Sequence, residues 1–164
     1  MSAYQKVLVG IDGSKQSEMA LKKGIATAKR NHARLYLLSI VNGPAKQQKL
    51  SFGFIDQSGY KKVGKDISRL VAAKKEEALA AGVEEVQADV INGNAKVELS
   101  TGYVTKNGID LVILGASGLN MVGRVIVGST TAYVVREAPC DVMVVRTDED
   151  NKPLQIEKAS YPKM

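Results

Sequence analysis

Short apolar runs alternate with longer amphipathic stretches along most of the chain. The runs are rich in branched residues and lack strict alternation of apolar and polar positions, which is typical of strands buried on both faces. They predict strands over residues 5–11, 34–41, 86–91, 109–114 and 141–147. Between them, apolar positions three and four residues apart predict helices over residues 14–30, 60–81, 95–107 and 129–138.

Strands that alternate with helices indicate an α/β fold, with an open parallel sheet and helices on both faces. We expect one doubly wound, Rossmann-like domain over residues 1–147, because 164 residues suit a single core. Residues 148–164 form a polar tail with two prolines, which we expect outside that core. Residues 42–59 show no periodicity and predict a long mobile loop.

Glycines stand where the fourth strand ends and again where the last helix begins. Gly115 and Gly118 follow the apolar run, and Gly128 precedes Ser129 at the helix start. Glycine lets backbone approach a ligand closely, and a helix start offers unpaired N–H groups and a positive dipole end. We expect Ser129 to be the N-cap, or to turn its hydroxyl to an anion. The pattern predicts a phosphate cradle; the alternative is that the glycines only form turns.

Asp12 ends the first strand, and its carboxylate allows two interpretations. It can hold a ribose hydroxyl or a phosphate-bound Mg²⁺. Alternatively, it accepts a hydrogen bond from Gly13 or Ser14 in an Asx-turn. The position at the carboxyl end of a strand favours the binding role, and Ile11 beside it can pack against a nucleoside.

The arrangement Gly115-x-x-Gly118-x9-Gly128-Ser129 resembles the ATP-binding signature of the universal stress protein family. The flanking strands and the opening segment, Val7 to Ser14, are similar as well, so the resemblance covers roughly residues 4–147. It implies a five-stranded sheet of order 3-2-1-4-5, in which the strand order reverses between the first and fourth strands. That order brings Asp12 close to Gly115, although they are far apart in sequence.

The resemblance also implies a ligand and a role for each candidate residue. ATP is the expected cofactor, with possible Mg²⁺ at Asp12 and with the glycines and Ser129 on the phosphates. Val41 and Leu114 would contact the adenine, with Ile11 beside the nucleoside. The implied function is a regulatory nucleotide switch in the stress response. Two alternatives stay open: slow ATP hydrolysis with Asp12 as the one candidate base, and a nucleotide-free dimeric interaction module.

The strand over 141–147 becomes an edge strand if the order is 3-2-1-4-5. Its four central residues, Val142 to Val145, are all apolar. An open apolar edge invites pairing with another strand. We therefore expect a homodimer built on Asp141–Thr147, as the resemblance also implies; the competing explanation is that the tail from Asp148 folds back over this edge.

Composition narrows the choice of compartment and partner. The net charge is +6, but aromatic residues make up only 5%, so nucleic-acid binding is not favoured. No apolar run approaches the roughly 18–20 residues of a membrane span. A single cysteine, Cys140, fits a reducing compartment, and we expect the cytoplasm.

Two further motifs are rejected on sequence grounds. The segment from Gly59 to Asp66 nearly spells a P-loop, but no strand precedes it and Asp66 replaces the hydroxyl residue that would bind Mg²⁺. His32, the single histidine, follows a helix end, where a surface role is favoured over catalysis. We identify no catalytic residue.

Overall fold

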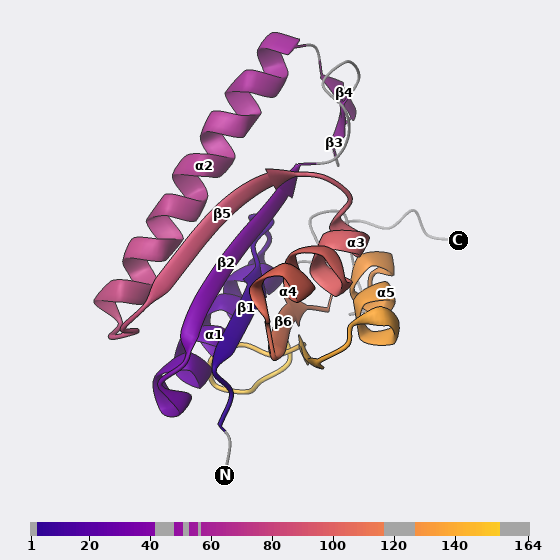
Figure 1. Ribbon diagram of the computed structural model, residues 1–164. Coiled ribbons are helices and arrows are strands. Elements are labelled where there is room, and N and C mark those ends of the chain that lie inside the picture. The colour runs from indigo at the N-terminus through magenta and orange to yellow at the C-terminus, as the bar shows by residue number, and fades with distance from the viewer. Residues whose placement is uncertain (1–2, 42–47, 51–52, 56, 117–126, 155–164) are drawn as a thin grey trace.

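The main sheet has five parallel strands, in the order that the sequence resemblance implies. A computed structural model describes residues 3–41, 48–50, 53–55, 57–116 and 127–154. The sheet consists of β1 (Lys6–Gly10), β2 (Arg34–Val41), β5 (Val86–Asn92), β6 (Leu111–Gly115) and β7 (Asp141–Val145). The order β5-β2-β1-β6-β7 corresponds to 3-2-1-4-5, so the predicted fold is confirmed (Figure 1).

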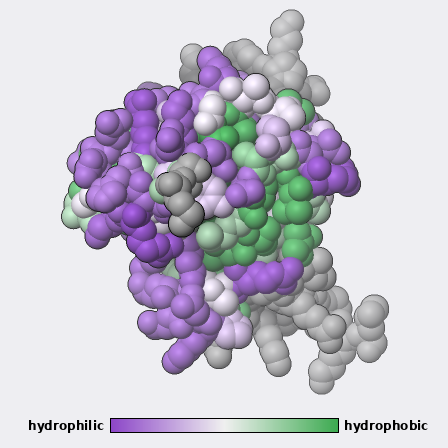
Figure 2. Space-filling view, turned by 60° about the horizontal axis from the view of Figure 1, so that its bottom comes forward, coloured by the Kyte–Doolittle hydropathy of each residue, from purple (hydrophilic) through white to green (hydrophobic). Residues whose placement is uncertain are grey.

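Helices cover both faces of this sheet. They are α1 (Lys15–Asn31), α2 (Gln57–Ala80), α3 (Ala95–Ser100), α4 (Gly102–Asn107) and α5 (Ser129–Glu137). One core joins α1 and α2 to one face, and the other joins α3, α4 and α5 to the opposite face. Val7 and Val9 point into the first core and Leu8 into the second, each fully buried. Figure 2 shows mostly hydrophilic surface on one side of the molecule, interrupted by a band of apolar side chains.

The centre of the sheet is the point at which the strand order reverses. β1 pairs with β2 on one side, where Val9 lies opposite Leu37, and with β6 on the other, where Val9 lies opposite Ile113. The connections after β1 and β6 therefore lead away in opposite directions. The carboxyl ends of these two strands lie side by side, which is where such sheets bind ligands.

The segment predicted as a loop contains regular structure. β3 (Gln48–Leu50) pairs antiparallel with β4 (Gly53–Ile55), and α2 already begins at Gln57. The expectation of a structureless loop over 42–59 is therefore wrong for these described residues. Strands of three residues are too short to show a two-residue period in the sequence.

The helix predicted over 95–107 is divided into α3 and α4. Thr101 lies between them with φ of −122°, outside helical geometry. The Ser100 hydroxyl donates to the carbonyl oxygen of Lys96, the kind of local bond that weakens a helix. An added Cβ at Gly102 would lie 2.6 Å from a Glu98 carboxylate oxygen, the end of a flexible side chain that can move away.

Beyond β7 the chain turns back on itself. Thr147 forms an antiparallel bridge with Pro153, and the amide of Leu154 donates to the carbonyl of Arg146 at 3.3 Å. Leu154 is buried, with 8% of its surface exposed. Regular pairing of β7 with the sheet thus ends at Val145, and the chain that follows is a hairpin.

Candidate functional site

The β1–α1 turn presents a carboxylate at the carboxyl end of β1. Asp12 is exposed, and its Oδ1 accepts the amide of Ser14 at 2.8 Å, so the Asx-turn is present. Gly13 has φ of +81°, a conformation that favours glycine. Ser14 then caps α1 by accepting the amide of Ser17 at 3.1 Å. The turn engages Oδ1, and the carboxylate can still face a ligand through its other oxygen.

Gly115 at the end of β6 packs against the first turn of α1. An added Cβ would lie 2.7 Å from the Gln16 Cβ and 2.8 Å from its carbonyl carbon. Real Cβ atoms do not approach backbone so closely, so this glycine is required by packing. Its carbonyl accepts the Thr131 hydroxyl at 2.9 Å, which ties α5 to the end of β6.

α5 begins at this same place without a side-chain cap. Its N-cap residue is Gly128, so the prediction that Ser129 is the N-cap is wrong. Ser129 is the first helical residue, and Gly128, which has no side chain to cap with, accepts the first helical bond from Ala132 at 2.9 Å. An uncapped helix start combines free N–H groups with the positive end of the helix dipole, which is a suitable environment for an anion.

Three segments distant in sequence therefore meet at the switch point. The amide of Gly128 donates to the carbonyl of Ala116 at 2.7 Å, which places the start of α5 directly after β6. The β1–β6 register, extended by two residues, sets Ile11 opposite Gly115. The structure thus brings together the Asp12 turn, the end of β6 and the start of α5. Gly118 lies outside the described residues.

The three apolar residues predicted near the nucleoside are almost completely buried. Ile11, Val41 and Leu114 expose 5%, 2% and 5% of their surfaces. Ile11 belongs to the core on the α1 side and Leu114 to the core on the α5 side, so their side chains lie on opposite faces of the sheet. The Val41 carbonyl accepts the amide of Gly93 at 3.0 Å. A carbonyl oxygen can accept a second hydrogen bond.

A hollow near Val41 contains residues that the sequence analysis did not single out. It measures about 530 Å³ and lies between α2 and the carboxyl ends of β2 and β5. Lys65, Ser68 and Arg69 of α2 line it, together with Asn92. Polar positions on a long helix are usually its solvated face, so their spacing carries no signal for a site.

The remaining candidates have structural roles. His32 ends α1 in the left-handed conformation, with φ of 53°. The near-P-loop segment lies within α2, so the rejection of a P-loop is confirmed. Burial raises the pKa of the half-buried Cys140 thiol, which disfavours the reactive thiolate. The described residues contain no group of three or more metal-ligating side chains, and no helix among them has an apolar stretch of membrane-spanning length.

These features define a doubly wound α/β domain in which the Asp12 turn, the end of β6 and the start of α5 meet at the switch point of the sheet, where folds of this kind bind ligands. A family model described as the universal stress protein family matches residues 3–146. A Staphylococcus haemolyticus protein named as a universal stress protein is 36% identical over 160 residues, covering 98% of this chain and 95% of that protein. The chain belongs to the universal stress protein family.

Solved structures agree with this assignment. Universal stress protein UspA from Lactobacillus plantarum matches with a TM-score of 0.74 and 27% identity, covering 89% of this chain and 100% of that one. A universal stress protein solved in complex with cAMP matches with a TM-score of 0.67 and 27% identity, covering 88% and 98% respectively. The likeness thus includes one protein that holds an adenine nucleotide.

Proposed function

We propose that this protein binds an adenine nucleotide, with ATP as the expected ligand, between the carboxyl ends of β1 and β6. The observation that carries the proposal is the start of α5, which has no side-chain cap and is fixed beside Gly115 at the switch point where the Asp12 turn also ends β1. The related structure in complex with cAMP supports an adenine nucleotide as the ligand class.

The phosphates would lie at the start of α5. Ser129 and Thr130 open the helix, and the first backbone amides of an α-helix have no carbonyl partner within the helix. Since Gly128 has no side chain, an approaching phosphate meets no Cβ there. Gly118 would contribute a further close approach of backbone to phosphate, and the Ser129 hydroxyl a further donor.

Asp12 would hold the ribose or a Mg²⁺ ion bound to the phosphates. The side chain is exposed, and a carboxylate oxygen is a ligand that Mg²⁺ prefers. The residues therefore fit the metal, which when bound would neutralise phosphate charge. Val41, with Ile11 and Leu114 beside the crevice, would contact the nucleoside through backbone atoms and the small exposed part of their side chains.

The role we propose is regulatory. Bound nucleotide would favour one of two conformations of the protein and so change the affinity of the protein for a partner. A ligand shifts such an equilibrium when it binds the two conformations with different affinities. A regulatory switch of this kind would hydrolyse ATP far more slowly than the roughly 10 per second of a typical enzyme. Asp12 is the one candidate for a general base. We place the protein in the cytoplasm, where ATP is abundant, and expect two copies to associate through β7.

Ser129→Glu tests the phosphate site without damaging the fold. A carboxylate at a helix start is favourable for the helix but repels phosphate. We expect ATP affinity to fall at least tenfold, about 1.4 kcal/mol, with no loss of thermal stability. Val135→Glu, on the exposed face of the same helix, is the matched control and should bind normally. Equal affinity of both variants and the parent in calorimetry would refute the phosphate site.

A further inference from the structure

The outer edge of β7 consists of an open part and a covered end. The backbone of Val145 faces β6, since its carbonyl accepts an amide of the chain that follows β6 at 3.0 Å. Successive residues of a strand direct their backbone groups to opposite sides, so Val142, Val144 and Arg146 direct theirs outward. The Arg146 carbonyl is already occupied, because it accepts the amide of Leu154 at 3.3 Å.

The covered end belongs to a hairpin over residues 146–154. Thr147 and Pro153 face each other in an antiparallel bridge, and the same pairing sets Leu154 opposite Arg146. Leu154 is buried in this position. The returning chain therefore fills the place beside residues 146 and 147, which another strand would need if it paired with them.

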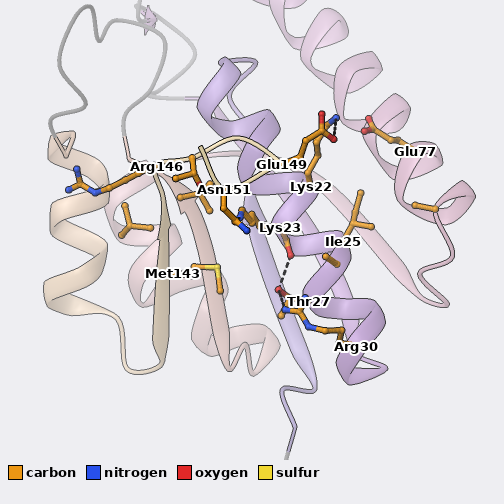
Figure 3. A pocket seen from close by; sticks show the side chains of 15 residues that line it. Lys22, Lys23, Ile25, Thr27, Arg30, Glu77, Met143, Arg146, Glu149 and Asn151 are labelled. Atoms are coloured by element: carbon orange, nitrogen blue, oxygen red, sulfur yellow. Dashed lines mark hydrogen bonds and ion pairs between the residues drawn. The ribbon is translucent and has the colours of Figure 1, made fainter. Parts of the chain in front are cut away.

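Contacts with α1 hold this hairpin in place (Figure 3). Lys22 pairs with Glu149 at 3.2 Å, and the Lys23 ammonium donates to the Asn151 side chain. Both lysines line a groove of about 800 Å³ between α1 and β7. Moving the hairpin away from the edge would break both contacts.

The part of the edge before the hairpin is open and apolar. Among the described residues, no strand pairs with the outer side of β7. Val142 packs on the α5 side of the sheet, and Met143 lies in the groove on the α1 side, with 36% of its surface exposed. Such an edge favours pairing with another strand, and a second copy offers the same edge in return.

Two identical antiparallel strands can form hydrogen bonds only in certain registers. Around a two-fold axis, residues with outward backbone groups must lie opposite one another. Within β7 (Asp141–Val145), the registers that pair at least three residues put Val142, Met143 or Val144 on the axis. Each step between these registers moves the second strand by two residues.

We propose that the hairpin selects the register in which Met143 lies on the two-fold axis. With Val144 on the axis, Val142 of the second copy would fall opposite Arg146. Leu154 already lies there, so this register is blocked. With Met143 on the axis, Val142 lies opposite Val144 of the second copy, and all five residues of β7 are paired. The register centred on Val142 pairs only three of them and forms fewer backbone bonds.

The inference rests on the association through β7 proposed above, and it adds the register and the role of the hairpin. The family model matches residues 3–146, so the hairpin begins where that match ends. The selection of the register thus comes from the C-terminal segment of this chain. The Met143 side chains of the two copies would meet on the α1 side of the joined sheet.

Cysteine cross-linking measures this register. In a non-hydrogen-bonded pair the two Cα atoms lie about 4.5 Å apart, within the range of a disulfide. With Cys140 replaced by serine, Met143→Cys should cross-link two copies under mild oxidation at least tenfold faster than Val142→Cys or Val144→Cys. An equal mixture of Val142→Cys and Val144→Cys should also cross-link, because these residues would lie opposite each other.

The outcomes separate the register from the association itself. A parent protein that stays monomeric at high micromolar concentration in sedimentation equilibrium would overturn the association, and this inference with it. A dimer that cross-links fastest through Val142→Cys or Val144→Cys alone would overturn only the register.

Leu154→Pro tests the role of the hairpin. The variant lacks the amide that the Arg146 carbonyl accepts, so the end of the edge becomes free. In this background we expect Val144→Cys to cross-link at least tenfold faster than it does beside an intact hairpin. A dimer with an unchanged cross-linking pattern would show that the hairpin does not select the register.

Two further variants serve as a control and as a second test. Pro153→Ala changes a position whose backbone faces away from β7, and it should leave the cross-linking pattern unchanged. Lys22→Ala combined with Lys23→Ala removes both contacts of the hairpin with α1 and should shift cross-linking toward Val144→Cys, as Leu154→Pro does. No shift in either variant would overturn the proposal.

Discussion

Single residues at the proposed nucleotide site also have a packing role. Gly115 belongs to the glycine signature, yet the structure shows that its lack of a side chain is needed against the backbone of Gln16. Asp12 is similar, because one oxygen of its carboxylate holds the turn that starts α1. The sequence could predict that these residues matter but not that each has a structural function, since that depends on contacts with distant segments.

Gly115→Ala should destabilise the fold by about 1–3 kcal/mol, because the new methyl group must displace the first turn of α1. Gly64→Ala is the control: it lies within α2, and an added Cβ meets no atom within 4 Å. That change should stabilise the protein by about 0.5–1 kcal/mol through the better helix propensity of alanine. Urea unfolding measures both, and an unchanged midpoint for Gly115→Ala would argue against the packing role.

Asp12→Asn separates the charge of Asp12 from its turn. The asparagine oxygen can still accept the amide of Ser14, so stability should be nearly unchanged. Loss of the negative charge should remove most of the gain in ATP affinity on adding Mg²⁺. Calorimetry with and without Mg²⁺ measures this; an equal gain in variant and parent would exclude Asp12 as a metal ligand.

At the scale of elements, α1 and α2 are joined by apolar packing and by one well-placed ion pair. Lys74 of α2 lies 2.6 Å from the Glu18 carboxylate of α1, with 18% of its side chain exposed. The hydrogen bond from Lys74 lowers the pKa of Glu18, and the same bond raises the pKa of Lys74. Neither residue was singled out in the sequence, since pairs between helices depend on how the helices dock.

Glu18→Gln should therefore cost up to about 1 kcal/mol of stability at neutral pH, as for a partly exposed pair. Because the folded-state pKa of Glu18 is lowered, its contribution is complete above the ordinary value of 4.5 and is lost as pH falls through the lowered pKa. The difference between variant and parent in urea unfolding should shrink below pH 4.5. Asp66→Asn, in an exposed pair with Arg69, is the control and should show no effect.

The elements themselves were largely predictable from periodicity. Long apolar runs such as Arg34–Val41 predict a strand without ambiguity. Gly82 and Gly108, both with positive φ, stand where the apolar pattern of a helix stops. The short strands β3 and β4 and the break at Thr101 were missed. Their signals are local hydrogen bonds and turn geometry, which hydrophobic periodicity does not report.

At the scale of the whole molecule, the strand order is what assembles the site. Periodicity indicates a parallel sheet, but the order came from the family resemblance, and that order sets β1 beside β6. The Asp12 turn, Gly115 and the start of α5 meet as a consequence. The same order leaves β7 as the outermost strand on the β6 side of the sheet.

A titration of the full chain with Mg²⁺-ATP, followed by the backbone amide signals of the protein, tests the central claim most directly. The account predicts saturable shifts for Gly115 and for Ser129 to Thr131 at the start of α5, with Asp12 in the same set. The Val135 amide, at the far end of that helix, should stay unchanged. Absence of saturable shifts at millimolar ATP, or shifts confined to residues outside the crevice, would contradict it.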